Sequence, residues 1–281
     1  MEIPATTLRR IVQSALEEDL GRGDVTTEAC VPEELAGAAE LRARQALVFC
    51  GLPVVREVFA QVDGSVSVEA RCQEGAKLSP GAVALALEGP AASLLKGERV
   101  ALNFAQRMSA TASLTRALVA AVPEGCALRI ADTRKTTPGL RALERYAVRA
   151  GGGRNHREDL SSAVLIKDNH VAACGGVRAA IERARAHAPH TSRITCEVDT
   201  MEQLDEAVTA GADVILLDNF DDATLDGAVA LTAGRALLEV SGNVSLERIE
   251  VIARAGIDVV SVGALTHSAG SVDLGLDWTG T

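Results

Sequence analysis

The second half of the chain repeats one unit, in which a short apolar run ends in a polar residue or glycine and is followed by a helix-like stretch. Six runs have this form, at 127–132, 163–167, 194–198, 213–218, 236–241 and 258–263. Near-continuous apolar strands that alternate with helices are typical of a parallel sheet covered by helices. Six or seven such strands fall short of the eight of a regular TIM barrel. The repeat therefore predicts an irregular α/β barrel.

The first hundred residues follow a different pattern. Apolar residues have helical spacing over 6–20, and a turn-rich stretch over 18–28 predicts a loop. Strand-like alternation over 37–49, 65–70 and 82–88, broken by Gly and Pro, indicates an antiparallel sheet, and a long helix is expected over 91–121. We place the domain boundary at residue 108, which gives an N-terminal α+β domain (1–108) and a barrel domain (109–267).

Four of the repeated runs contribute polar residues at or near the ends of the predicted strands: Lys167, Glu197, Asp218 and Ser241. Each has a simpler explanation alone, because an Asp or Ser after a strand often caps a helix and a Lys often extends to solvent. In a barrel, however, these ends meet at one mouth, where active sites lie. Two carboxylates there suit a Mg²⁺ ion that is bound together with a phosphate substrate. The turns at 241–243 and at Gly263 offer backbone N–H groups for phosphate.

A basic, glycine-bearing segment lies between two of the apolar runs. Between residues 129 and 157 there are seven Arg and one Lys against Asp132 and Glu144, in a chain of net charge −10. This local cluster predicts an anion site. The acidic chain, with a pI near 5.1 and 2% aromatic residues, would repel nucleic acid and lacks stacking side chains, so the anion is expected to be a small molecule. The glycine run 151–153 is weak evidence, since such a run forms either a mobile or a tightly folded loop.

Composition also indicates where the chain is expected to act and how its cysteines are used. No apolar run approaches the roughly 18 residues that span a bilayer, and the first residues lack a secretory signal, so we expect a cytoplasmic protein. The six cysteines form no CxxC pair and stand mostly in apolar surroundings. They are interpreted as reduced core residues, without a structural zinc site.

Several longer segments together resemble one family. DTRKTTPGLRALERYAVRAGGGRNHR (132–157), VLIKDNH (164–170) and VILLDNF (214–220) are the most specific, and EDLGRGDVTTEA (18–29), GERVALNFAQRMSATAS (97–113), EVDTMEQLDEA (197–207) and VSVGALTHSAGSVDLGLD (260–277) accompany them in order. Together they resemble quinolinate phosphoribosyltransferase, also called carboxylating nicotinate-nucleotide pyrophosphorylase. The resemblance covers nearly the whole chain.

The resemblance implies a type II phosphoribosyltransferase. Its reaction joins quinolinate to phosphoribosyl pyrophosphate and yields nicotinate mononucleotide, pyrophosphate and CO₂, the entry into NAD made de novo. The implied fold is an N-terminal open sandwich, joined by the C-terminal tail (268–281), plus the α/β barrel. The implied assembly is a dimer or a trimer of dimers whose active site is shared between subunits.

The resemblance also implies the role of each site residue. For quinolinate these are Arg99 from the neighbouring subunit, Thr133, Arg134, Lys135, His156 and Arg157. For phosphoribosyl pyrophosphate they are Lys167, Glu197, Asp218, Ser241, Gly242, Asn243 and Gly263. Catalysis is expected from Lys135, Lys167, Glu197 and Asp218, with Glu197 and Asp218 holding Mg²⁺ directly or binding the ribose hydroxyls.

Two departures and two alternatives accompany this interpretation. Thr195 and Ser162 stand where the family pattern has acids, but neither carries an expected role. The acid-rich loop of type I phosphoribosyltransferases is missing. A Schiff-base aldolase would also place a lysine such as Lys167 at a strand end. A paralogue associated with molybdate transport would lack the set of dicarboxylate-binding cations that includes Arg99.

Overall fold

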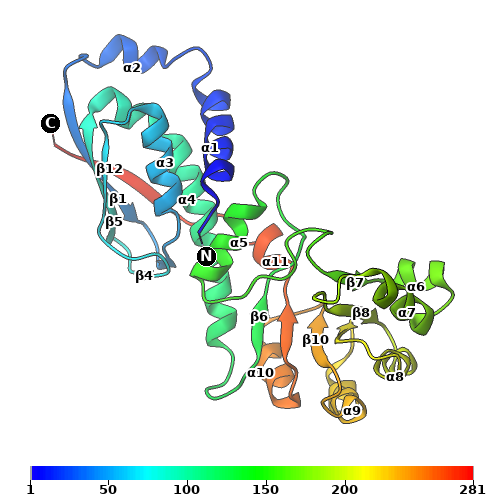
Figure 1. Cartoon of the computed structure of the whole chain (residues 1–281). Coiled ribbons are helices and arrows are strands. Elements are labelled where there is room, and N and C mark those ends of the chain that lie inside the picture. Colours follow the sequence, from blue (N-terminus) through cyan, green and yellow to red (C-terminus); the bar gives the residue numbers. More distant parts are fainter. Residues whose placement is uncertain (1, 281) are drawn as a thin grey trace. The chain divides into compact units, whose positions relative to one another are not determined.

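The computed structural model describes residues 2–280, and the chain forms two compact units. The first comprises Met1–Arg116, Thr136–Gly152 and Ala264–Thr281, and the second comprises Ala117–Lys135 and Gly153–Gly263. Each unit is therefore assembled from segments that are distant in the sequence (Figure 1).

The first unit contains an antiparallel sheet of four strands in the order β12-β1-β5-β3. The strands are β1 (Ala36–Ala43), β3 (Ser67–Ala70), β5 (Val83–Pro90) and β12 (Leu274–Gly280), and β2 (Leu47–Val48) pairs separately with β4 (Lys77–Leu78). Every second residue of β1 is buried, as expected for a strand with one face on a core. Strand β12 from the end of the chain pairs with β1, with Leu41 opposite Leu276.

The helices of this unit are α1 (Ala5–Leu20), α2 (Val25–Cys30), α3 (Leu52–Val62), α5 (Arg141–Ala150), α11 (Ala264–His267) and most of α4 (Ala91–Ala120). The apolar faces of α1, α3, α4 and α5 share one core with the sheet, in which Val12, Phe49 and Phe59 are almost fully buried. The expectation of a loop over 18–28 was wrong in part, because α2 lies there. Asp24 caps this helix by accepting a hydrogen bond from the backbone N–H of Thr27 at 3.0 Å.

The second unit is a six-stranded parallel sheet with helices on its outer side (Figure 1). Its strands are β6 (Arg129–Ala131), β7 (Val164–Ile166), β8 (Ile194–Val198), β9 (Val214–Asp218), β10 (Leu237–Ser241) and β11 (Val259–Ser261). Its helices are α6 (Asp168–Cys174), α7 (Val177–His187), α8 (Met201–Thr209), α9 (Asp222–Thr232) and α10 (Leu246–Ala255). All six strands that the repeat predicted are present, in the order β6-β11-β10-β9-β8-β7. The register places Asp218, Ser241 and Ser261 in one row.

The loop after Gly153 extends the sheet beyond β6. Arg154 forms a parallel bridge with Ala131, its N–H donates to the carbonyl of Ile130 at 2.8 Å, and its carbonyl accepts from the N–H of Asp132 at 3.1 Å. The residues after Arg154 are thereby held at the carboxyl end of β6. Gly151 ends α5, is buried, and its carbonyl accepts from Nε of Arg116 at 2.8 Å, so the start of the glycine run is tightly folded.

The cysteines and the helix lengths test two expectations from composition. All six cysteines are free, as expected, but only Cys50 and Cys196 are buried, and Cys30 is exposed. The prediction of core residues was therefore wrong for Cys30, whereas Cys126 and Cys174 are only partly buried and Cys72 packs at the edge of the core. Within residues 2–280, every helix is too short or too polar to cross a membrane.

Candidate active site

One pocket of about 310 Å³ lies within the second unit, at the carboxyl ends of its strands. Its lining residues are Thr133, Arg134, Lys135, His156, Arg157, Leu165, Lys167, Glu197, Leu216, Asp218, Glu239, Ser241 and Ser261. Nine of these were predicted as site residues from the sequence. The structure therefore brings together side chains that lie more than a hundred residues apart, as the carboxyl ends of a parallel barrel do.

Four predicted residues do not line this pocket. Gly242 and Asn243 follow β10 directly, and Gly263 follows β11 and precedes α11. Arg99 is an exposed residue of α4 in the first unit. Their expected roles stay predictions.

The cations come from the end of β6 and from the loop that is bridged to it. Asp132, which is fully buried, accepts the backbone N–H of His156 at 2.7 Å and Nδ2 of Asn155 at 2.5 Å. This carboxylate fixes the start of the loop that carries Arg157. One guanidinium nitrogen of Arg157 donates to the carbonyl of Ala163 at 3.2 Å. Burial, and then the neighbouring guanidinium of Arg134, lower the pKa of Arg157 below its ordinary value. A bound anion would relieve both effects.

Lys167 and Glu197 form an ion pair on this pocket. Nζ of Lys167 lies 2.8 Å from Oε2 of Glu197, whose side chain is 12% exposed. Lys167 also starts α6, because its backbone N–H donates to Nδ1 of His170 at 2.9 Å. The simpler explanation, a lysine that only extends to solvent, therefore does not hold.

Asp218 and Ser241 end neighbouring strands and cap no helix. Asp221 caps α9, and Ser245 caps α10. Oδ2 of Asp218 accepts from Nδ2 of Asn219 at 2.9 Å. Burial and the nearby carboxylate of Asp199 raise the pKa of Asp218, although Lys167 and Lys135 oppose them. The pocket thus holds a carboxylate whose charge is costly until a cation or a hydroxyl donor joins it.

The turn after β10 has a geometry that requires its glycine. Gly242 has φ +87°, and a Cβ there would come within 2.3 Å of Oδ1 of Asn219. Arg248, at the start of α10, donates to the carbonyls of Gly242, at 3.0 Å, and of Phe220. Arg248 therefore ties the turns after β9 and β10 together. The sequence analysis placed helix N–H groups at 241–243, but α10 begins later, at Leu246.

Two pocket residues with polar side chains were missed from the sequence, Glu239 and Ser261. Both are 3% exposed and lie inside strands β10 and β11. A charged residue within the apolar run 236–241 was the available signal for Glu239, because an unpaired buried carboxylate is costly. Ser261 had no comparable signal.

The donor set fits a hard cation that arrives with its substrate. Glu197 and Asp218 offer carboxylate oxygens from adjacent strands, and Mg²⁺ is commonly held by one or two carboxylates, substrate phosphates and water. Among residues 2–280, no group of three or more His, Cys, Asp or Glu side chains is placed to hold a metal without such a substrate.

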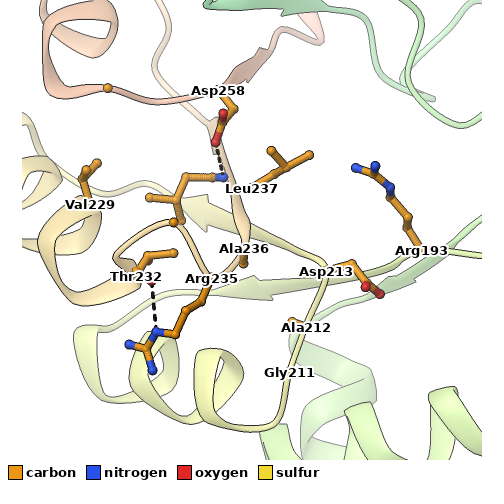
Figure 2. A pocket seen from close by; sticks show the side chains of 13 residues that line it. Arg193, Gly211, Ala212, Asp213, Val229, Thr232, Arg235, Ala236, Leu237 and Asp258 are labelled. Atoms are coloured by element: carbon orange, nitrogen blue, oxygen red, sulfur yellow. Dashed lines mark hydrogen bonds between the residues drawn. The ribbon is translucent and has the colours of Figure 1, made fainter.

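A second hollow, of about 580 Å³, lies near the amino ends of the strands (Figure 2). Its carboxylates serve the backbone: Asp213 accepts the N–H of Ile194, and Asp258 that of Leu238, both at 2.8 Å. Arg235 turns back to the carbonyl of Thr232 at 3.1 Å. These contacts hold strand starts in place, which is the usual task of this end of a barrel.

The fold and the pocket define an α/β-barrel enzyme whose site, at the carboxyl ends of the strands, divides into a cationic side and a carboxylate side. Residues 24–109 match the N-terminal domain of quinolinate phosphoribosyl transferase, and residues 111–277 match its C-terminal domain. The chain belongs to the quinolinate phosphoribosyltransferase family.

Individual relatives support the same family assignment. A probable nicotinate-nucleotide pyrophosphorylase [carboxylating] of Bacillus subtilis is 42% identical, over 97% of this chain and 93% of that protein. A nicotinate-nucleotide pyrophosphorylase [carboxylating] of Mycobacterium leprae is 44% identical, over 96% of each. The crystal structure of NadC from Streptococcus pyogenes superposes with a TM-score of 0.94 at 40% identity, over 99% of each chain.

Proposed function

We propose that this chain transfers the phosphoribosyl group of phosphoribosyl pyrophosphate to quinolinate and releases pyrophosphate and CO₂, leaving nicotinate mononucleotide. The observation that carries the proposal is the division of charge within one pocket. Arg134, Lys135 and Arg157 stand at the end of β6 and on the loop bridged to it, whereas Glu197 and Asp218 stand on β8 and β9. A dicarboxylate suits the first side and a sugar with a leaving phosphate suits the second.

The cationic side suits two carboxylates on one flat ring. Arginine presents several N–H donors in a fixed plane, so two arginines and a lysine can hold both carboxylates at defined angles. The lowered pKa of Arg157 beside Arg134 supports an anion at this place. Thr133 and His156 add polar contacts, and Arg99 is proposed to reach the site from a neighbouring subunit. That last role makes the enzyme a homodimer, or a trimer of dimers, with shared sites.

The carboxylate side suits the phosphoribosyl group. Lys167 is proposed to contact phosphate, and Glu197 and Asp218 to bind ribose hydroxyls or Mg²⁺. Ser241, Gly242, Asn243 and Gly263 are proposed to surround a phosphate with hydroxyl and backbone N–H groups. When bound, Mg²⁺ would neutralise charge on the leaving pyrophosphate.

The reaction needs no covalent enzyme intermediate. The quinolinate nitrogen forms a bond to C1 of the ribose while the bond from C1 to the pyrophosphate oxygen breaks. Glu197 and Asp218 are proposed to offset positive charge on the sugar in the transition state. The bond from C2 of the ring to its carboxylate then breaks and CO₂ leaves. The electron pair stays on C2, beside the pyridinium nitrogen, and C2 takes up a proton from water. The Arg cluster contributes by holding the other carboxylate still.

The remaining expectations complete the proposal. We propose that the enzyme acts in the cytoplasm, with small molecules and not nucleic acid as partners. We also propose functional domains at 1–108 and 109–267, with the tail 268–281 joined to the first. A Schiff-base aldolase is disfavoured because Nζ of Lys167 donates to Glu197 at 2.8 Å, whereas such a lysine must present a free amine.

The test is turnover by the purified chain with quinolinate, phosphoribosyl pyrophosphate and Mg²⁺. CO₂ and pyrophosphate should appear in equal amounts, and nicotinate in place of quinolinate should give neither. Folded protein that is silent with both bases would contradict the proposal and favour the transport-associated paralogue. Borohydride trapping of a substrate on Lys167 would instead favour the aldolase.

A further inference from the structure

The buried carboxylate of Glu144 belongs to α5 of the first unit and does not line the pocket. Its side chain is 6% exposed. Oε2 accepts the backbone N–H of Thr137 at 3.0 Å, and Oε1 accepts from a guanidinium nitrogen of Arg107, on α4, at 3.2 Å. The same nitrogen of Arg107 donates to Oγ1 of Thr137 at 2.7 Å. One residue of the loop before α5 is therefore held through its backbone and its side chain at once.

A β-turn from Thr137 to Leu140 fixes the same residue from the other direction. The carbonyl of Thr137 accepts the N–H of Leu140 at 3.0 Å, and Pro138 and Gly139 occupy the two central positions. Gly139 has φ +81°, and a type II turn needs a positive φ at this position, commonly with Pro before it. The turn leads directly into α5, where the carbonyl of Leu140 accepts the N–H of Glu144 at 3.1 Å.

Thr137 follows closely on two cations of the pocket, Arg134 and Lys135. The chain passes from the second unit to the first between Lys135 and Thr136. On the pocket side of this crossing, the N–H of Lys135 donates to Oγ1 of Thr133 at 3.1 Å, shortly after β6. Two residues of backbone span at most about 7 Å, so an anchor at Thr137 restricts Lys135. The segment is thus held at both ends, each end within its own unit.

The return of the chain to the second unit has a matching tether. The second unit resumes at Gly153, and Arg157 follows four residues later. Arg116 of α4 donates through Nε to the carbonyl of Gly151 at 2.8 Å and through a terminal nitrogen to that of Ala150 at 3.2 Å. An arginine of α4 therefore anchors the chain in the first unit next to each crossing, and each crossing leads to cations of the pocket.

We propose that Glu144, together with Arg107, is a positioning residue for the quinolinate side of the pocket. It acts through Thr137, by limiting the freedom of the segment that carries Arg134 and Lys135. Cations on a segment that is already ordered can hold a dicarboxylate without the loss of backbone entropy at the moment of binding. The inference rests on the proposed function for its effect on quinolinate, and on the contacts alone for its effect on the segment.

Two substitutions remove the anchor by different amounts. Glu144→Ala releases both the N–H of Thr137 and the guanidinium of Arg107. Glu144→Gln keeps the length of the side chain and one oxygen acceptor for Thr137, but it loses the charge that pairs with Arg107. The effect of Glu144→Gln should therefore lie between wild type and Glu144→Ala.

Asp63→Ala is the matched control. Asp63 follows α3 in the same unit and also joins a loop to α4, because Oδ1 accepts the N–H of Ser65 at 2.9 Å and Oδ2 accepts from Oγ of Ser93 at 2.7 Å. Its removal costs the same kinds of hydrogen bond, at a place that is remote in sequence from both crossings. A merely structural role of Glu144 would give the two alanine variants the same behaviour.

The first measurement is hydrogen exchange of the Thr137 and Lys135 amides in the full chain, followed by NMR. Glu144→Ala should speed exchange at Thr137 roughly tenfold or more, because that amide loses a charged acceptor, and should also speed exchange at Lys135. Asp63→Ala should change neither amide. Faster exchange at Thr137 with Lys135 unchanged would overturn the proposal, because the anchor would then not reach the cations. This measurement needs no turnover.

Kinetics give the second measurement. Ordering about one freed backbone residue corresponds to roughly a tenfold loss of affinity, so Glu144→Ala should raise KM for quinolinate about tenfold and leave KM for phosphoribosyl pyrophosphate unchanged. Asp63→Ala should leave both KM values unchanged. An equal rise of both KM values in Glu144→Ala, or no rise for quinolinate, would overturn the proposal.

The two measurements separate this inference from the proposed function. A wild-type protein that does not turn over quinolinate would contradict the proposed function, and the exchange at Lys135 would still decide whether Glu144 orders the segment. If Glu144→Ala does not fold, Glu144→Gln decides in its place: a higher KM for quinolinate with faster exchange at Lys135 supports the proposal, and wild-type values of both overturn it.

Discussion

Asp132 is the residue on which the geometry of the cationic loop depends most. It is fully buried at the end of β6, and its two carboxylate oxygens accept from Nδ2 of Asn155 and the N–H of His156. A hydrogen bond to a charged group contributes about 1.5–3 kcal/mol, so Asp132→Ala should cost about 3–6 kcal/mol. That is a large fraction of the roughly 5–15 kcal/mol by which a typical protein is stable.

The comparison variants define the expected order. Asp132→Asn keeps one oxygen for the His156 N–H and can pair its amide with a flipped Asn155, so it should cost about 1–2 kcal/mol. Asp221→Ala removes the exposed carboxylate that caps α9 and should cost about 1 kcal/mol. The loss of unfolding free energy should therefore be largest for Asp132→Ala and similar for Asp132→Asn and Asp221→Ala.

The assay is urea unfolding followed by circular dichroism, with hydrogen exchange of the His156 amide as a local readout. Trp278 is the single tryptophan and lies on β12 of the first unit, so its fluorescence serves as an internal control for that unit. Asp132→Ala should lower the unfolding midpoint of the second unit and speed exchange at His156. An Asp132→Ala protein that loses less than Asp221→Ala, with His156 exchange unchanged, would refute this reasoning.

Three further predictions follow from the pocket. Arg157→Ala should raise KM for quinolinate and leave binding of phosphoribosyl pyrophosphate largely intact; equal weakening of both would contradict the assignment of this side. Asp218→Asn should be more stable than wild type at neutral pH. The folded-state pKa of Asp218 is raised, so its ionisation opposes folding, and the advantage of Asp218→Asn should shrink as the pH falls through that raised pKa and be gone below the ordinary aspartate pKa; an advantage that grows as the pH falls would be inconsistent with this sign. Inactive Arg99→Ala and Lys167→Ala subunits, when mixed, should regain part of the activity because one intact shared site can form; no rescue would place Arg99 in the site of its own subunit.

Much of the barrel was predictable because its strands carry a local signal. Buried parallel strands are continuous apolar runs, so β8, β9 and β10 could be found from their composition and their spacing. The polar residues at their ends could be assigned to one mouth because parallel strands share a direction. Asp218 and Ser241 lie on one pocket for this reason.

Other features depend on contacts between distant segments and had no local signal. Oε1 of Glu239, on β10, lies 3.5 Å from Nε2 of His156, which belongs to the loop after α5, and its position inside an apolar run was the available hint. Arg248 had no sequence signal for its role, although it ties two turns together. Helix α2 was hidden in a stretch rich in turn formers, because the Asp24 that caps it is also a common turn residue.

The central claim is that the cationic side of the pocket selects a second carboxylate on the pyridine ring. The most direct measurement is titration calorimetry of quinolinate and of nicotinate with wild-type protein and with Arg134→Gln. Nicotinate lacks one of the two carboxylates of quinolinate and so forms fewer charge-assisted hydrogen bonds. Wild type should therefore bind quinolinate roughly 10- to 100-fold more tightly than nicotinate. Arg134→Gln should lose most of that preference. Equal affinity of wild type for the two ligands would contradict the account.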